Sequence, residues 1–455
     1  MKRCFLPLLL ACALCFSEER PQKAGVESWP APVPGFTPPA PGEHPRLFFR
    51  KADLPELKKR SETPEGKAIL SRLKATLGGG ESMPATYNPA RKAYEAKAQF
   101  PEGTYSISHA AGFGMLYQLT GDKKYAELGK ECFEKAFAGQ RDRDGEARYS
   151  WSVPGGQLRA GPSLAWYALG YDLCYEGWDE EFRRKVAGAI QNYAPGDSGK
   201  EGNMALKEMV LKTRHMPASN HWGSIIGGCG IALLAIKGDP GTDAALTEKH
   251  LAEIEKKAIQ AMTQGFGDGG FFPEGQGPSH MASNPALIPF FQAMKVAGGK
   301  DFISPRPNVQ WLSLRWIHEL IPDASGKPLY PCRVGGMGGS YGTENFLEQQ
   351  GGMSHGGWFS QGMGLLTDSQ KQAMLWTYDN VVRKADADRY DSVNYPHRAI
   401  LALINWPIGE QAKNPEGIVP KVRADTVHSY FGFRNRWQDA DDSRDCSHGR
   451  RTACL

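Results

Sequence analysis

The feature that most constrains the fold of this chain is a succession of helical segments joined in pairs by loops rich in glycine and proline. Apolar residues recur with helical spacing, and a turn that contains glycine, such as the one at Gly121, joins the two helices of a pair. Paired helices are expected at residues 106–120 and 123–137, 158–174 and 179–193, and 220–237 and 247–265. Further helices are expected at residues 52–77, 282–297, 308–321, 367–385 and 397–405.

Chains of helical hairpins fold either as open solenoids or as closed rings. Strand-like alternation is scarce before residue 420, the hairpins vary in length, and long glycine-rich loops interrupt them. No fixed short repeat is visible, which favours the ring, whose loops collect at one mouth and form a cleft. We therefore expect a mainly α protein with an (α/α) toroid over residues 44–419.

The character of the sequence changes after residue 420. Residues 426–437 alternate aromatic and polar side chains and predict a strand. Residues 443–451 have no packing pattern and predict an unstructured tail. We expect residues 420–455 to be the truncated start of a β-domain followed by this tail.

The first 43 residues predict export. Lys2 and Arg3 precede an apolar run at residues 4–16, which is too short to span a bilayer and suits a signal peptide over residues 1–17. Residues 18–43 are rich in proline and predict an extended linker. The mature protein is expected in the periplasm or outside the cell, as a soluble protein rather than a lipoprotein.

Composition excludes several classes of function. The formal charge of +4 is spread over 455 residues with no long basic run, so nucleic acid is not an expected partner. No later segment is apolar enough for integral membrane association, and no zinc-type cysteine spacing appears. Eleven Trp, sixteen Tyr and 53 Gly suit a surface for sugar rings, although aromatic residues equally fill a core. We expect no metal and no cofactor.

Several motifs occur in a shared order along the chain. They are HPRLFF at 44–49, ADLPEL at 52–57, LYQLTGD at 116–122, ALGYDL at 168–173, NHW at 220–222, GDGGFFPEG at 267–275 and the segment 430–437. Together they resemble the heparinase II/III-like polysaccharide lyases, an alginate lyase-like α/α-toroid family. The resemblance implies a toroid followed by a C-terminal β-sandwich that is largely missing here. It also implies β-elimination on an acidic, uronate-containing polysaccharide.

Such a reaction removes the proton at C5 of a uronic acid and expels the oxygen at C4. The sugar carboxylate opposes the carbanion, so the site must neutralise it and must supply a base and an acid. Asn220 and His221 are the candidates for the carboxylate, because they begin a predicted helix whose free N–H groups favour an anion. Equally, Asn220 is a common helix cap, and His221 beside Trp222 has a packing role. Trp222 is also a candidate substrate contact.

Further candidates lie in the glycine-rich loops: Glu274 and Trp358 as substrate contacts, and His280, Tyr341 and His355 as acid or base. Glu274 and His280 flank the end of the GDGGFFPEG loop, where the family commonly offers a Tyr; this chain has none between residues 267 and 289, so His280 is the substitute base. Tyr341 offers a phenol from another loop, or covers the core. His355 and Trp358 lie among glycines that allow a sugar to approach, or that form a flexible turn.

The remaining candidates are assigned by position. Arg159, at another helix entrance, is suited to a bidentate contact with a second acidic group or to a surface ion pair. His397 is expected to be structural, and His44 and Arg46 to fix the N-terminal segment onto the helical domain.

Two alternative functions remain open. A glycoside hydrolase on a similar helical ring needs two carboxylates across the scissile bond, and Asp268 with Glu274 is the evident pair. A non-catalytic carbohydrate-binding relative would bind the polysaccharide without turnover.

Overall fold

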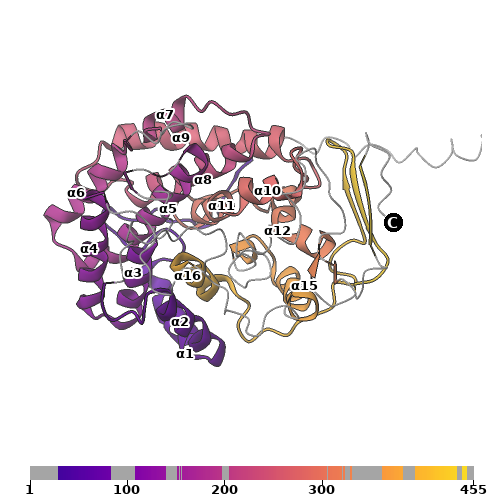
Figure 1. Ribbon diagram of the computed structural model, residues 1–455, viewed down its shortest axis with the longest axis horizontal. Coiled ribbons are helices and arrows are strands. Elements are labelled where there is room, and N and C mark those ends of the chain that lie inside the picture. Colours follow the sequence, from indigo (N-terminus) through magenta and orange to yellow (C-terminus); the bar gives the residue numbers. More distant parts are fainter. Residues whose placement is uncertain are drawn as a thin grey trace, which may run out of the picture.

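The computed structural model describes residues 29–83, 108–139, 151–152, 154, 156–196, 204–304, 306–319, 321–322, 328–329, 361–382, 395–437 and 443–447. These residues are mainly helical, as the sequence predicts (Figure 1). None of the helices within them combines the length and the apolar character needed to cross a membrane.

The element bounds are as follows. The α-helices are α1 (Leu54–Glu62), α2 (Pro64–Thr76), α3 (His109–Thr120), α4 (Lys123–Phe137), α5 (Gln157–Cys174), α6 (Glu180–Gln191), α7 (Leu206–Leu211), α8 (Asn220–Ala235), α9 (Ala244–Gln260), α10 (Gln276–Ser283), α11 (Leu287–Val296), α12 (Pro307–Glu319), α15 (Asp368–Thr377) and α16 (Pro396–Asn405). Short 3₁₀ or π turns are η1 (Lys51–Asp53), η2 (Tyr175–Gly177), η3 (Ala261–Gly265) and η4 (Tyr378–Val382). The strands are β1 (Ala31–Pro32), β2 (Lys300–Asp301), β3 (Ile321–Pro322), β4 (Pro328–Leu329), β5 (Val422–Asp425), β6 (Tyr430–Arg434) and β7 (Ser443–Ser447).

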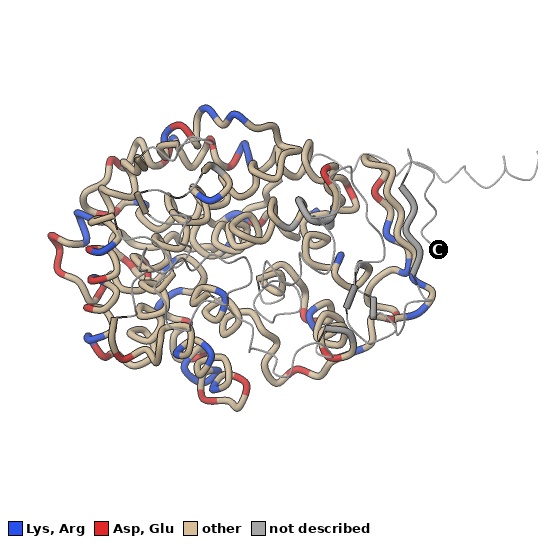
Figure 2. Tube along the Cα trace, in the orientation of Figure 1, with Lys and Arg blue, Asp and Glu red and all other residues tan. Residues whose placement is uncertain are grey.

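The helices form an inner and an outer layer. The inner helices α3 and α8 carry no Lys, Arg, Asp or Glu, and every residue of α8 except His221 is buried. The outer helices α4, α6 and α9 bury one face and place charged residues on the other, as Figure 2 shows. This difference follows from the sequence, because a helix that is apolar all round must be covered on all sides, whereas an amphipathic one needs only a single neighbouring layer.

Neighbouring inner helices run in the same direction. Gly170 of α5 lies against Ala110 of α3, and Leu173 of α5 lies against Gly114 one turn further along α3. The outer helix returns antiparallel, since Trp222 at the start of α8 donates from Nε1 to the carbonyl of Lys257 near the end of α9, at 3.0 Å. Helices α3 and α5 therefore begin at the same end of the layer, and α9 runs in the opposite direction to α8.

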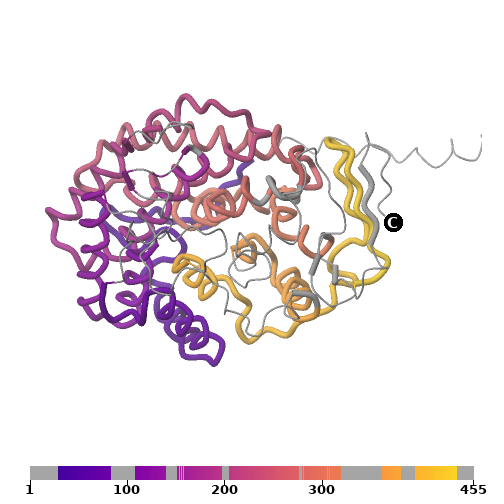
Figure 3. The backbone as a smooth tube through the Cα atoms, in the orientation of Figure 1, coloured from indigo at the N-terminus to yellow at the C-terminus, as the bar shows by residue number. Residues whose placement is uncertain are grey.

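The last helix of the helical part returns to the first ones. Helix α16 packs against α2 and α3, and Figure 3 shows this gold helix beside the indigo and purple N-terminal helices. Nδ1 of His397 in α16 is hydrogen-bonded to Oγ of Ser108, at 3.0 Å. At its other end α16 meets α11, where Asn405 and Gln292 exchange two amide hydrogen bonds of 2.7 and 3.0 Å.

Some predicted helix bounds were wrong for local reasons. The single helix predicted over residues 52–77 is divided because Thr63 caps α2 through its hydroxyl and Pro64 begins that helix. The helix predicted over residues 282–297 starts earlier, at Gln276, and is split into α10 and α11. The short helix α7 was not predicted.

The proline-rich segment is not a free linker over its second half. Ala31 and Pro32 pair with Asp301 and Lys300 in an antiparallel ladder, and Trp29 donates from Nε1 to the carbonyl of Phe302 at 3.1 Å. The rings of Trp29 and Phe302 also pack edge to face, with centroids 5.2 Å apart. Residues 29–43 therefore belong to the helical domain, while residues 1–28 lie outside the described residues.

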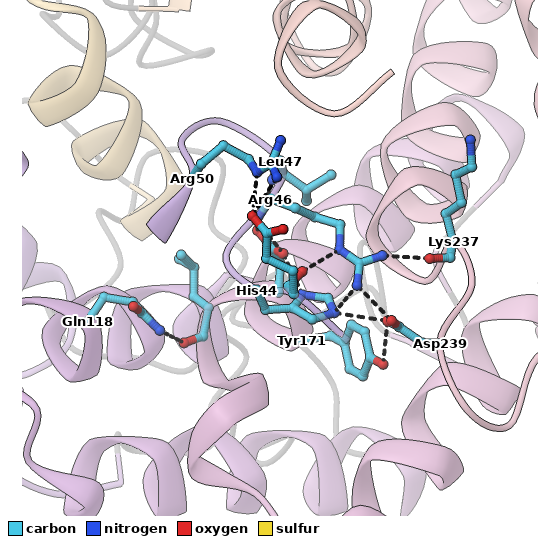
Figure 4. Close-up of polar contacts among 11 residues, drawn as sticks. His44, Arg46, Leu47, Arg50, Gln118, Tyr171, Lys237 and Asp239 are labelled. Atoms are coloured by element: carbon cyan, nitrogen blue, oxygen red, sulfur yellow. Dashed lines mark hydrogen bonds and ion pairs between the residues drawn. The ribbon is translucent and has the colours of Figure 1, made fainter. Parts of the chain in front are cut away.

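His44 and Arg46 fix the N-terminal segment onto the domain, as the sequence suggested. His44 is held between the carboxylates of Asp172 in α5, at 2.7 Å, and Asp239 after α8, at 2.9 Å. Figure 4 shows His44 beside Asp239. Arg46 donates to Asp239 at 2.6 Å, and Tyr171 donates to the same carboxylate at 2.9 Å. All five residues are buried, so the network satisfies charges that would be costly if left alone.

The C-terminal segment forms a three-stranded antiparallel sheet in the order β5-β6-β7. The strand predicted over residues 426–437 was partly wrong, because residues 426–429 form the turn between β5 and β6, with Ser429 at a φ of 52°. The predicted unstructured tail was also wrong at residues 443–447. These residues form β7, in register with β6 from Tyr430 opposite Ser447 to Arg434 opposite Ser443, because the free edge of β6 supplies backbone donors and acceptors.

Candidate active site

The start of α8 brings together the best candidate residues for chemistry. Ser219 caps the helix, and Asn220 and His221 are its first two residues. Asn220 is 7% exposed, and its side-chain nitrogen lies 3.8 Å from the sulfur of Met281 in α10, which is a weak acceptor. The carboxamide of Asn220 therefore keeps hydrogen-bonding capacity at the position where the inner helices begin.

Glu274 lies at the same helix start. One of its carboxylate oxygens accepts a hydrogen bond of 3.0 Å from the backbone N–H of Asn220. A helix N-terminus favours an anion, and here an internal carboxylate already takes part of that role. Glu274 thus lies next to Asn220, where its carboxylate is bound to the backbone of α8.

His221 is the residue of α8 that is not buried. Its ring stacks on the ring of His215, with centroids 4.1 Å apart and planes 10° from parallel. His215 was missed by sequence reasoning, although it lies six residues before His221 in the segment that enters α8. Its only signal was a histidine close to the NHW motif.

His280 lies on α10, which packs against α8. Gly223 of α8 touches Ala282, and Gly227 touches Ala286 beyond the end of α10, so the two segments run in parallel and position 280 is level with position 221. The side chain of His280 is outside the described residues. Two described residues of α10, Ser279 and Ser283, accept hydrogen bonds through their hydroxyl groups from Arg315 of α12. A buried cation therefore lies against α10.

Trp222 packs into the helical core. It is buried, its Nε1 donates to the carbonyl of Lys257, and its ring faces α9. The structure therefore gives Trp222 a packing role and lends no support to its prediction as a substrate contact. Successive side chains of an α-helix point in different directions, so Trp222 points to another side of α8 than Asn220 and His221 do, and that side is the core.

The other candidates divide between described and undescribed residues. Arg159 is half-buried in the first turn of α5, and Gly161 of that helix lies against Gly228 of α8. Tyr341, His355 and Trp358 lie outside the described residues.

His397 is structural, as the sequence suggested. It is buried, stacks on Trp166 of α5 with centroids 4.0 Å apart, and is bonded to Ser108. Burial, with the nearby charge of Arg398, lowers the pKa of His397 well below its ordinary value, so the ring is neutral near neutral pH.

Asp268 is committed to another part of the molecule. Its two carboxylate oxygens accept from the backbone N–H of Thr426 at 2.7 Å and from the Thr426 hydroxyl at 2.6 Å. Partial burial raises the pKa of Asp268, but these bonds and backbone bonds from Val427 and Gly269 outweigh it and leave the pKa below its ordinary value. Asp268 therefore lacks the raised pKa of a general acid and faces the β5–β6 turn.

Neither a metal site nor a known family is identified for the described part of the chain. Within the described ranges, no group of three or more His, Cys, Asp or Glu side chains is arranged to hold a metal ion. The buried thiols of Cys132, Cys174 and Cys229 have pKa values raised by burial, which makes them poor ligands. No protein-family model matches the chain, and no curated protein matches it.

Proposed function

We propose that this protein is a polysaccharide lyase that cleaves a uronate-containing polysaccharide, such as alginate or a glycosaminoglycan, by β-elimination. The observation that carries the proposal is the start of α8. There a buried Asn carboxamide and a partly exposed His lie side by side, with Glu274, His215 and the backbone of position 280 around them.

Each residue has a role in this reaction. The Asn220 amide and the His221 imidazole neutralise the sugar carboxylate, which makes the C5 proton removable. Because Glu274 occupies the backbone N–H of Asn220, the sugar carboxylate binds to the two side chains rather than to the helix backbone. His280 is the proposed base, with Tyr341 and His355 as further proton donors or acceptors and Arg159 and Trp358 as substrate contacts.

We also propose that the inner helices close into an (α/α) toroid. The supporting contacts run from α3 to α5, from α5 to α8 and from α8 to α11, and α16 joins α11 back to α3. In such a ring the starts of the inner helices share one mouth, so the positive ends of their dipoles favour an acidic substrate there. An exported protein of the periplasm or the extracellular medium suits a polymeric substrate.

The test is an assay for the unsaturated uronate, which absorbs ultraviolet light. Incubation with alginate, hyaluronan, chondroitin sulfate and heparan sulfate is expected to raise the absorbance with at least one polymer. Asn220→Ala and His221→Ala are expected to lower kcat/KM by about a hundredfold or more, because each removes a group that stabilises the developing charge. Asn192→Ala, at an exposed position after α6, is the matched control and should leave the rate unchanged.

Other outcomes would replace the proposal. New reducing ends without ultraviolet absorbance would indicate a hydrolase, which the binding of Asp268 to Thr426 disfavours. Binding of a polysaccharide without any product would indicate the non-catalytic relative.

A further inference from the structure

The glycine-rich loop at residues 265–271 is held by the β5–β6 hairpin. The carboxylate of Asp425, the last residue of β5, accepts from the backbone N–H of Gly269 at 3.1 Å and of Phe271 at 2.8 Å. The same carboxylate accepts from the N–H of His428 in the hairpin turn at 2.9 Å. Asp425 is fully buried, so it joins the loop and the hairpin through a single desolvated group.

Further contacts surround this carboxylate. Arg423 of β5 donates from Nε to the carbonyl of Gly269 at 2.8 Å, and His428 is bonded through Nε2 to the carbonyl of Gly265 at 3.1 Å. The Phe271 ring stacks on Tyr430 of β6 with centroids 4.3 Å apart. The loop is therefore fixed at its beginning, middle and end by the same hairpin.

The glycines of the loop are explained by this contact. A Cβ at Gly267 would collide with the carboxylate of Asp425, and a Cβ at Gly269 would collide with the carbonyl of Ala424. Two of the glycines in the GDGGFFPEG motif thus allow the hairpin to approach, independently of any substrate.

The loop leads directly to the candidate site. Phe272 is buried against Phe266, and Glu274 follows two residues later, where it accepts from the backbone N–H of Asn220. Asp425 is therefore connected to the start of α8 in three steps. It is hydrogen-bonded to Phe271, three residues of chain lead from Phe271 to Glu274, and Glu274 is hydrogen-bonded to Asn220.

We propose that Asp425 is a positioning residue for the candidate active site: it fixes the glycine-rich loop so that Glu274 holds the start of α8 and the Asn220 side chain in place. The inference rests on the proposed function for its catalytic meaning. Its structural core is that the β5–β6 hairpin controls the geometry at Asn220, which lies on a different element and far from Asp425 in the sequence.

The test compares Asp425→Asn with Asp301→Asn in the full chain. Asp301 is a matched control, since it is a buried carboxylate that accepts from the N–H groups of Ile303 and Ser304, but its loop has no contact with Glu274 among the described hydrogen bonds. In Asp425→Asn, an amide N–H₂ faces backbone donors. Amide hydrogen exchange is then expected to rise in peptides covering residues 265–275 and also in those covering residues 217–224. Asp301→Asn should raise exchange around residues 300–304 alone.

Turnover gives a second readout that lost stability alone would not produce. At a temperature where both variants remain folded, Asp425→Asn is expected to lower kcat by about a hundredfold with little change in KM, because a small displacement of a reacting group has an effect of that size. Asp301→Asn should keep the wild-type kcat. Unchanged exchange at residues 217–224 in Asp425→Asn, or equal loss of kcat in both variants, would overturn the inference. If the wild type eliminates none of the polymers, the proposed function fails, and the exchange at residues 217–224 still decides whether Asp425 positions α8.

Discussion

At the scale of single residues, the space around Gly267 is set by a carboxylate that lies far along the chain. Gly267 does not occupy the left-handed region, whereas Gly270 does, with a φ of 72°. The two glycines are therefore constrained differently: the first leaves room for Asp425, whereas the second adopts a conformation that other residues avoid and also leaves room for Trp311. The glycine-rich motif of this chain is thus required by close packing as well as by turn geometry.

Gly267→Ala should therefore destabilise the protein through collision alone. The added methyl group would push against the buried Asp425 carboxylate, and overpacking of this kind typically costs about 1–3 kcal/mol in the free energy of unfolding. Gly196→Ala is the control, because a Cβ there would lie 3.4 Å from the carbonyl of Ser152, an ordinary contact. Urea unfolding of both variants measures the difference; equal midpoints would contradict the collision.

The candidate site was only partly predictable at this scale. The helix start at Asn220 followed from the sequence, because Ser219 and the preceding proline mark a boundary that local chemistry decides. The bond between Glu274 and the Asn220 N–H joins groups 54 residues apart, and the stack of His215 on His221 depends on the path of a loop. Neither contact leaves a periodic signal. The burial of Trp222 likewise depends on α9, and the sequence pattern around Asn220 does not report it.

At the scale of elements, apolar periodicity predicted the paired helices well. Helix α4 has the predicted bounds, and α8 begins at the predicted residue, because turns with Gly or a capping Ser limit them. Strand β7 was missed because its stability comes from pairing with the edge of β6, and its own residues have no apolar alternation. An element that depends on its neighbour is less visible in the sequence than one that buries its own apolar face.

The junction between α12 and the β5–β6 hairpin should be sensitive to acid. His318 of α12 donates to the carbonyl of Pro420 at 2.8 Å, and burial, together with the charges of Arg423 and Arg434, lowers the pKa of His318 to about 3. In the unfolded chain His318 has an ordinary pKa of about 6.5 and binds a proton between about pH 6.5 and pH 3, whereas in the folded chain it stays neutral over that range. The free energy of unfolding therefore falls as the pH drops from about 6.5 towards 3. At pH 5 this residue alone should remove about 2 kcal/mol of stability.

The measurement compares wild type with His318→Gln, whose amide can still donate towards Pro420. Unfolding free energies at pH 7 give the cost of the substitution itself. The further loss between pH 7 and pH 5 should then be smaller in the variant by about 2 kcal/mol. Equal losses in the two proteins would mean that His318 binds its proton equally well when folded.

At the scale of the whole molecule, contacts between distant helices decide whether the inner layer closes. Local periodicity predicts hairpins, but it is equally compatible with a solenoid, since both arrangements use the same helices. The distinction lies with α16, which touches α3 through His397 and Ser108 and meets α11 at its other end. The pair of amides formed by Gln292 and Asn405 joins α11 to α16 across 113 residues of chain.

This amide pair should be a measurable link between the two halves of the inner layer. Both side chains are buried and each satisfies the other, so Gln292→Ala or Asn405→Ala leaves one buried amide without its partner, at a cost of about 1–3 kcal/mol. In the double variant both polar groups are gone, and the loss should be smaller than the sum of the single losses by about 0.5–3 kcal/mol. Denaturant unfolding of the four proteins measures this coupling free energy. Strictly additive losses would mean that α11 and α16 are not joined in solution, and the proposed closure of the inner helices into a ring would lose its main support.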